Sequence, residues 1–161
     1  MSSNTLQSQI LFQLYRTWSS ANPMFVRLGE GRFNITRREW RILATLANYG
    51  ACSSTVLAQK AELDPARTSR TVTRLVTKGW ISREKHAHNT RSVWITLTPA
   101  GQALYDQMMP IIMDMNNRLT QDLSPEEKQN LLQALEKITQ RAMEMNEAQI
   151  IPEKARRGIY A

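Results

Sequence analysis

The stretch that decides the fold runs from Leu57 to Gly101 and reads LAQKAELDPARTSRTVTRLVTKGWISREKHAHNTRSVWITLTPAG. Its pattern gives, in order, the end of a short helix, a basic second helix, a charged hairpin and the start of a further helix. Only short turns separate these elements, so we expect them to pack together as one supersecondary unit.

Local signals mark where the two helices of this unit begin and end. The residues Ser53–Ala61 combine hydroxyl groups suited to an N-cap with apolar positions at helical spacing. Asp64 is placed to cap a second helix over Pro65–Lys78, and its proline takes the first helical position, where a missing N–H costs nothing. Gly79 follows as the residue expected in the left-handed conformation that ends a helix.

The second helix has one apolar stripe, formed by Val72, Leu75 and Val76, which we expect to face inward. Its other notable residues are placed mostly on the remaining faces: Arg67, Thr68, Arg70, Thr71 and Arg74.

Two strands follow, over Trp80–Glu84 and Val93–Leu97, with Lys85–Arg91 as the polar tip between them. In the second strand, apolar residues alternate with others, as in a strand with one buried face. A short helix, a basic helix and a hairpin in this order are typical of a winged helix-turn-helix.

Basic residues cluster in this unit. Seven lie between Arg67 and Arg91 against the single acid Glu84, so this segment carries +6 of the chain's formal +7. A lone basic helix is usually a solvated face, but clustering favours a polyanionic partner. A basic helix fits the DNA major groove, and a basic hairpin tip reaches phosphates or the minor groove. We therefore expect double-stranded DNA as a partner.

The sequence resembles the MarR family of winged-helix transcriptional regulators. The resemblance is carried by Leu63–Arg83, by Asn89-Thr90-Arg91 and by Leu97–Gly101. The family's wing usually carries Asp-x-Arg, followed several residues later by Leu-Thr-x-x-Gly. Here Asn89 replaces the Asp, which removes a carboxylate that would hold the guanidinium of Arg91 in a bidentate pair.

The resemblance implies a mainly α fold with a small β-hairpin wing, as a single domain over residues 1–161. A winged-helix lobe covers about residues 36–98, dimerisation helices cover about 5–28 and 99–148, and a tail of open role covers 149–161. It implies a twofold homodimer, and two recognition helices one DNA turn apart would read a pseudo-palindrome. The alternative is that the apolar stripes of the outer helices close a monomeric core.

The flanking sequence marks four further helices. Capping boxes begin at Thr36 and Ser124, each with a glutamate three residues later. The helices are expected over residues 6–27 with an interruption at Asn22–Pro23 and a loop at 29–31, from Thr36 to about Tyr49, from Thr98 to about Leu119 with a kink at Pro110, and from Ser124 to about Met145.

Candidate DNA contacts follow from position on the helices. Base edges are within reach of the first two turns of the second helix, at Ala66, Arg67 and Arg70. Thr68, Ser69 and Arg74 are predicted to contact DNA phosphates. The same is predicted for Ser54 and Thr55 at the start of the preceding helix. The resemblance adds Arg91 at the minor groove. Arg74 and Arg83 suit a structural ion pair equally well.

The resemblance also implies release from DNA by a small aromatic carboxylate or phenolic effector bound between the dimerisation helices and the winged helix. Aromatic and methionine walls with one guanidinium suit such a ligand, and Arg16 would pair with its anion. The candidate residues are Tyr15, Arg16, Trp18, Phe25, Trp40, Arg41, Met108, Met109 and Met113. The aromatic and methionine residues suit a plain core equally well, and a regulator that is ligand-independent or differently triggered is the alternative.

Other functions find little support in the sequence. We expect no catalytic residues, no cofactor and no metal, since phosphate loops, zinc motifs and nucleophile elbows are missing. His86 and His88 lack a nearby cysteine or well-placed carboxylate that would complete a metal site. The sole cysteine, Cys52, cannot form an intrachain disulfide and is expected to be an inert small residue.

No basic leader or long apolar run is present, which favours a cytoplasmic protein that does not enter a membrane. The rival class is a winged helix that binds an acidic protein. Preference among duplexes of different sequence would separate that class from a DNA-binding regulator.

Overall fold

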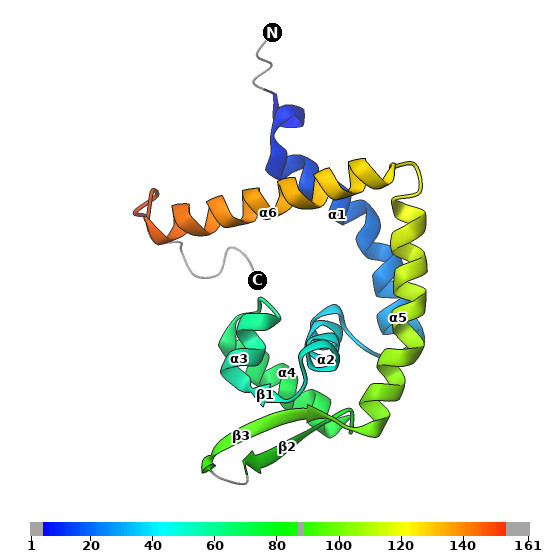
Figure 1. The fold of residues 1–161 in the computed structure, drawn as a ribbon, viewed down its shortest axis with the longest axis vertical. Coiled ribbons are helices and arrows are strands. Elements are labelled where there is room, and N and C mark those ends of the chain that lie inside the picture. Colours follow the sequence, from blue (N-terminus) through cyan, green and yellow to red (C-terminus); the bar gives the residue numbers. More distant parts are fainter. Residues whose placement is uncertain (1–4, 87–88, 154–161) are drawn as a thin grey trace. The chain divides into compact units, whose positions relative to one another are not determined.

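The computed structural model describes residues 5–86 and 89–153, and shows helices with one small antiparallel sheet (Figure 1). The chain divides into two units, Met1–Met113 and Asp114–Ala161, and α5 runs from the first into the second. In chain order the elements are η1 (Leu6–Ser8), α1 (Ile10–Val26), η2 (Arg27–Arg32), α2 (Arg37–Tyr49), β1 (Cys52–Ser53), α3 (Ser54–Lys60), α4 (Pro65–Thr77), β2 (Ile81–His86), β3 (Asn89–Leu97), α5 (Pro99–Leu119) and α6 (Pro125–Glu147).

The predicted helix caps are confirmed. Thr36 and Ser124 each form a complete capping box with the glutamate three residues later. The Asp64 carboxylate accepts from the Arg67 N–H at 2.8 Å and so begins α4. Gly79 has a φ of 73°, the left-handed conformation predicted for it. These caps depend on neighbours along the chain, which explains why the sequence reveals them.

The sheet has one strand more than the sequence predicts. Its order is β1-β3-β2, and β1 pairs Cys52 with Ile95 and Ser53 with Trp94. Two residues are too short a run to show a strand pattern. The hairpin strands are also longer than predicted, because β2 extends to His86 and β3 begins at Asn89. The predicted polar tip over Lys85–Arg91 is therefore wrong.

The N-terminal region also differs from the prediction. α1 continues through Pro23 without the predicted interruption, and Pro23 lies on an exposed face of the helix. The expected loop at 29–31 lies instead within the π-helical turn η2. Gly29 permits this turn, since a Cβ there would lie 2.6 Å from the Ile35 carbonyl oxygen.

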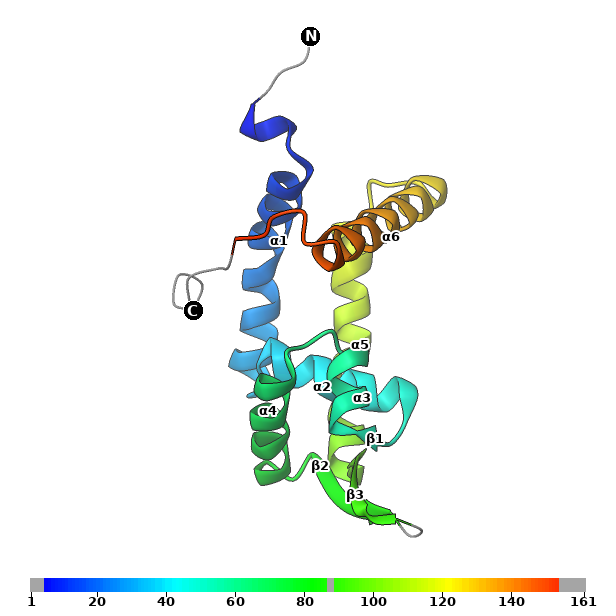
Figure 2. The ribbon, with the colours of Figure 1, turned by 90° about the vertical axis from the view of Figure 1, so that its left-hand side faces the viewer.

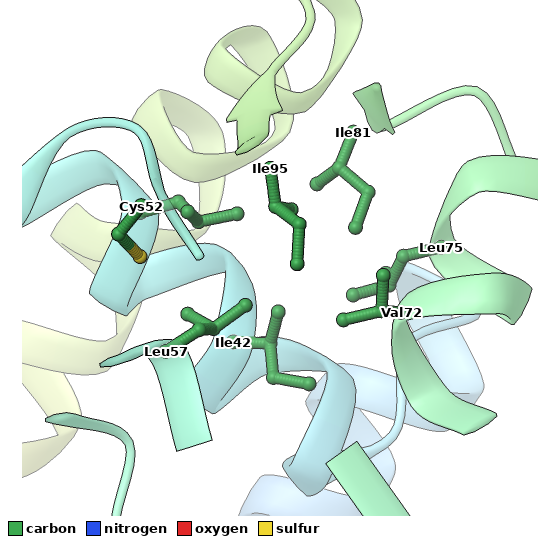
Figure 3. Packing of buried hydrophobic residues seen from close by; sticks show 8 residues of the cluster. Ile42, Cys52, Leu57, Val72, Leu75, Ile81 and Ile95 are labelled. Atoms are coloured by element: carbon green, nitrogen blue, oxygen red, sulfur yellow. The ribbon is translucent and has the colours of Figure 1, made fainter. Parts of the chain in front are cut away.

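Two buried clusters hold the first unit together. The first joins α2, α3, α4 and the sheet, and Figure 3 shows its side chains converging: Ile42, Cys52, Leu57, Val72, Leu75, Ile81 and Ile95. The second joins α1, α2 and α5 through Phe25, Ile35, Trp40, Leu43 and Met108. Trp80 and Leu97 pack against both clusters. In Figure 2, α2, α3 and α4 are grouped beside the sheet, so the hairpin and α4 belong to one packed body.

The junction between hairpin and α5 generates a stability prediction. A Cβ at Gly101 would overlap the Trp80 carbonyl oxygen, a backbone atom that a rotamer change cannot move. We expect Gly101→Ala to cost about 3 kcal/mol of unfolding free energy, measured by urea denaturation. Gly31→Ala is the matched control, because a Cβ added there would have nothing within 4 Å. Equal stability of the two variants would contradict the close packing at Gly101.

Candidate nucleic-acid interface

The outer face of α4 is polar and exposed. Ala66, Arg67, Ser69 and Arg70 are all exposed in its first two turns. The inner face is anchored by Val72 and Leu75, as predicted, and Val76 packs against the same cluster. The helix therefore presents its basic N-terminal half to solvent while its apolar stripe is held in the core.

Thr68 does not lie on this exposed face. It is fully buried, and its hydroxyl donates to the Asp64 carbonyl at 2.8 Å. Thr71 is buried in the same way and donates to the Arg67 carbonyl at 2.9 Å. The prediction that Thr68 contacts a phosphate is wrong. The reason is that back-bonding to the preceding turn lets a threonine enter an apolar stripe without an unpaired hydroxyl.

A hollow of about 490 Å³ lies between α2 and α4. Four arginines line it, together with Thr71: Arg38, Arg67, Arg70 and Arg74. The sequence predicts DNA contacts for Arg67, Arg70 and Arg74 but not for Arg38, which lies in the capping segment Thr36–Glu39 that predicts only the start of a helix. A signal was present, because Arg38 follows Arg37 directly and the two place paired positive charges in the first turn of α2.

The recognition helix is tied to α2 through Glu39. This carboxylate is buried, yet Lys78 Nζ lies 3.0 Å from Oε2 and Arg74 Nε lies 3.9 Å from Oε1. Thr36 N–H donates to the same carboxylate at 2.8 Å. Burial raises the pKa of Glu39, but the Thr36 and Lys78 hydrogen bonds outweigh it and hold the pKa below its ordinary value. Arg74 therefore takes part in an ion pair, one of the two roles left open for it.

The remaining DNA candidates have different surroundings. Thr55 is exposed and Ser54 half-buried at the start of α3. Arg83 donates to the Thr73 hydroxyl at 2.9 Å, and within the described residues it has no carboxylate within 4.0 Å. The backbone of Arg91 lies in β3, but its side chain lies outside the described residues. The same holds for the side chains of His86 and Asn89 and for all of His88.

The structure does not bring the nine effector candidates together. Phe25, Trp40 and Met108 are members of the second core cluster, and Met109 packs against it. Arg41 forms an ion pair with Glu62, with 3.7 Å between Arg41 Nη2 and Glu62 Oε2. The other four are exposed: Tyr15, Arg16, Trp18 and Met113.

Arg37 is a candidate that the sequence analysis missed. Its guanidinium carbon lies 4.3 Å from the Phe25 ring centroid and 5.7 Å from that of Trp18. Its Nε is buried and has no hydrogen-bond partner within residues 5–86 and 89–153. Burial and the charge of Arg41 lower its pKa. An unpaired guanidinium donor between two aromatic rings is suited to an aromatic anion.

This arrangement defines a winged helix-turn-helix protein whose recognition helix carries exposed arginines. A family model described as MarR family matches residues 35–93. The multiple antibiotic resistance protein MarR of Salmonella typhimurium is 29% identical over 106 residues, which are 65% of this chain and 74% of that protein. Residues 35–93 thus match the MarR family of winged helix-turn-helix transcriptional regulators, and the chain is similar to curated proteins of that name.

Solved structures agree with this assignment. A probable transcriptional regulator from Pseudomonas aeruginosa has a TM-score of 0.74 at 26% identity, covering 83% of this chain and 99% of that one. BpsR of Bordetella bronchiseptica, whose DNA binding is regulated by 6-hydroxynicotinic acid, has the same fold with a TM-score of 0.73 at 23% identity over 82% of this chain and 99% of its own. The family and these relatives are transcriptional regulators, not enzymes. Among the described residues, no helix is long and apolar enough to cross a membrane.

The Glu39 cluster generates a pH-dependent prediction. We expect Glu39→Gln to keep the helix cap, lose the Lys78 ion pair and cost about 2 kcal/mol of unfolding free energy at pH 7. Because the folded-state pKa is lowered, the wild-type advantage is present above pH 4.5 and is lost as the pH falls through the folded value. Urea denaturation between pH 3 and pH 7 measures the difference.

Glu127→Gln is the matched control, since Glu127 completes the same capping box on α6 but has no cation within 4.0 Å among the described residues. We expect its stability to stay near that of the wild type. A Glu39→Gln variant that behaves like this control would show that Lys78 contributes nothing to the anchoring of α4.

Proposed function

We propose that this protein is a homodimeric repressor that binds a pseudo-palindromic operator and leaves it when a small aromatic acid binds. The observation that carries the DNA-binding part is the exposure of Arg67 and Arg70 on the first two turns of a helix whose opposite face is buried. Arginine in that position reads guanine through its O6 and N7 atoms. Contacts to the phosphate backbone of the DNA beside it are supplied by Ser54, Thr55, Ser69 and Arg74.

The exposed apolar residues of the outer helices support the homodimer. In α1 the side chains of Ile10, Leu11 and Leu14 are exposed, Leu11 to 74%. In α6 no residue is buried, and its exposed residues include Leu132 at 67%. Apolar residues gathered along helices at this exposure mark an interaction surface. A second copy of the chain is the partner that would also space two recognition helices for one operator.

Arg37 supports the effector part of the proposal. Its buried, unpaired Nε and the neighbouring rings of Trp18 and Phe25 provide a charge and an apolar wall for a planar carboxylate. BpsR, which shares the fold, is regulated by a hydroxylated aromatic acid of this kind. We therefore place the effector near Arg37 rather than at the buried Trp40 and Met108.

The first experiment titrates the protein against the duplex upstream of its own gene and against shuffled duplexes at fixed salt. We expect preferred binding with two chains per duplex. Arg70→Ala should cost about 1–3 kcal/mol and relax the preference at one base pair in each half-site. Arg74→Ala, at a backbone position, should weaken all duplexes alike. Wild-type binding without sequence preference would favour the rival class, a winged helix that binds an acidic protein.

The effector prediction uses the same duplex with 6-hydroxynicotinate, salicylate and benzoate. We expect at least one acid to release the wild-type protein. Release of the Arg37→Gln variant should require about tenfold more acid, because one charged hydrogen bond to the acid is lost. Without acid, the variant should bind the duplex as tightly as the wild type. Arg27→Gln, an exposed arginine of η2, is the control and should respond like the wild type. Unchanged release from Arg37→Gln would remove Arg37 from the effector site, and Arg16→Gln would then be tested in its place.

A further inference from the structure

The arginine-lined hollow contains more positive charge than the protein around it neutralises. Of its four arginines, only Arg74 has a carboxylate within 4.0 Å among the described residues. That carboxylate belongs to Glu39, which lies closer to Lys78, at 3.0 Å against 3.9 Å for Arg74. Thr71 adds no negative charge, and its hydroxyl is already bonded to the Arg67 carbonyl. Guanidinium groups gathered in this way repel each other until an anion lies between them.

The position of Arg38 identifies the anion. Arg67, Arg70 and Arg74 belong to the helix that the proposed function places in the major groove, whereas Arg38 reaches the same hollow from the first turn of α2. The wall of the major groove is the phosphate backbone, so a side chain beside the inserted helix meets phosphates and not base edges. The flat guanidinium of arginine matches two phosphate oxygens at once.

We propose that Arg38 is a DNA-binding residue, which clamps a backbone phosphate in the hollow between α2 and α4 together with Arg74. This inference rests on the proposed function. It adds a DNA contact from α2, which lies outside the helix-turn-helix pair α3 and α4. This contact raises the affinity for DNA without discriminating between sequences. Arg38 fixes how α4 lies against the backbone, while Arg70 reads the base pairs.

The test measures duplex affinity of the full-length protein across a range of salt concentrations. Each phosphate contact contributes about 0.9 to the slope of log affinity against log salt. Arg38→Gln should lower that slope by about 1 for each bound protomer and weaken all duplexes by about tenfold at low salt, without changing the preferred sequence. Arg38→Lys should restore most of the slope because it keeps the charge. Arg32→Gln, which removes an exposed charge outside the hollow, should change the slope little, and circular dichroism checks that each variant is folded.

The outcomes separate this inference from the proposed function. A slope for Arg38→Gln equal to that of Arg32→Gln, with operator preference intact, overturns the phosphate contact and leaves the regulator standing. If the salt slope falls in Arg38→Gln but the wild type shows no operator preference, the phosphate contact is supported and the proposed regulator function is overturned. A second experiment measures the binding of inorganic tripolyphosphate to the wild type and to Arg38→Gln by calorimetry. If Arg38→Gln loses tripolyphosphate binding but keeps the duplex slope, the hollow holds a free phosphorylated compound and the DNA assignment is wrong.

Discussion

The buried carboxylate of Glu39 is the contact on which the placement of the recognition helix depends. One oxygen completes the cap of α2 with Thr36, and the same oxygen accepts a bond from Lys78 at the end of α4. Lys78 also donates to the Asn34 carbonyl at 2.7 Å. A buried charge is tolerated only when it is paired and hydrogen-bonded, so these partners must keep their positions together. The start of α2 and the end of α4 are therefore fixed by one group.

This anchoring matters because α4 has to present charge outward while it packs inward. Val72 and Leu75 fill the core, and Thr68 and Thr71 enter the same buried face by bonding back to the helix. The face left to solvent carries arginines. Among the described residues only Arg74 of the four that line the hollow has a carboxylate partner, so a polyanion can neutralise the others. An exposed basic face on a helix that is packed into the core agrees with the similarity to DNA-binding regulators.

The parts of the fold that the sequence predicted correctly are those decided by near neighbours. The Thr36–Glu39 box, the Asp64 cap and the left-handed Gly79 each involve residues within four positions of one another, so the pattern states them directly. The errors concern longer range. The strand β1 exists only because Cys52 and Ser53 pair with β3, and Thr68 is buried on a helix that packs against α2 and α3. No local sequence pattern predicts the strand β1 or the burial of Thr68.

The sequence by itself determined the order of helices and hairpin, their capped ends and the concentration of charge on one helix. It did so because periodicity, capping and charge are properties of short segments. Only the tertiary structure decided which charges are free and which are held. It brought Arg38 beside Arg67 and paired Arg41 with Glu62. It also left the Nε of Arg37, which lies over the Phe25 ring, without a hydrogen-bond partner among the described residues. The physical reason is that an arginine's role depends on the carboxylates and rings within a few ångströms, and packing brings those from distant parts of the chain.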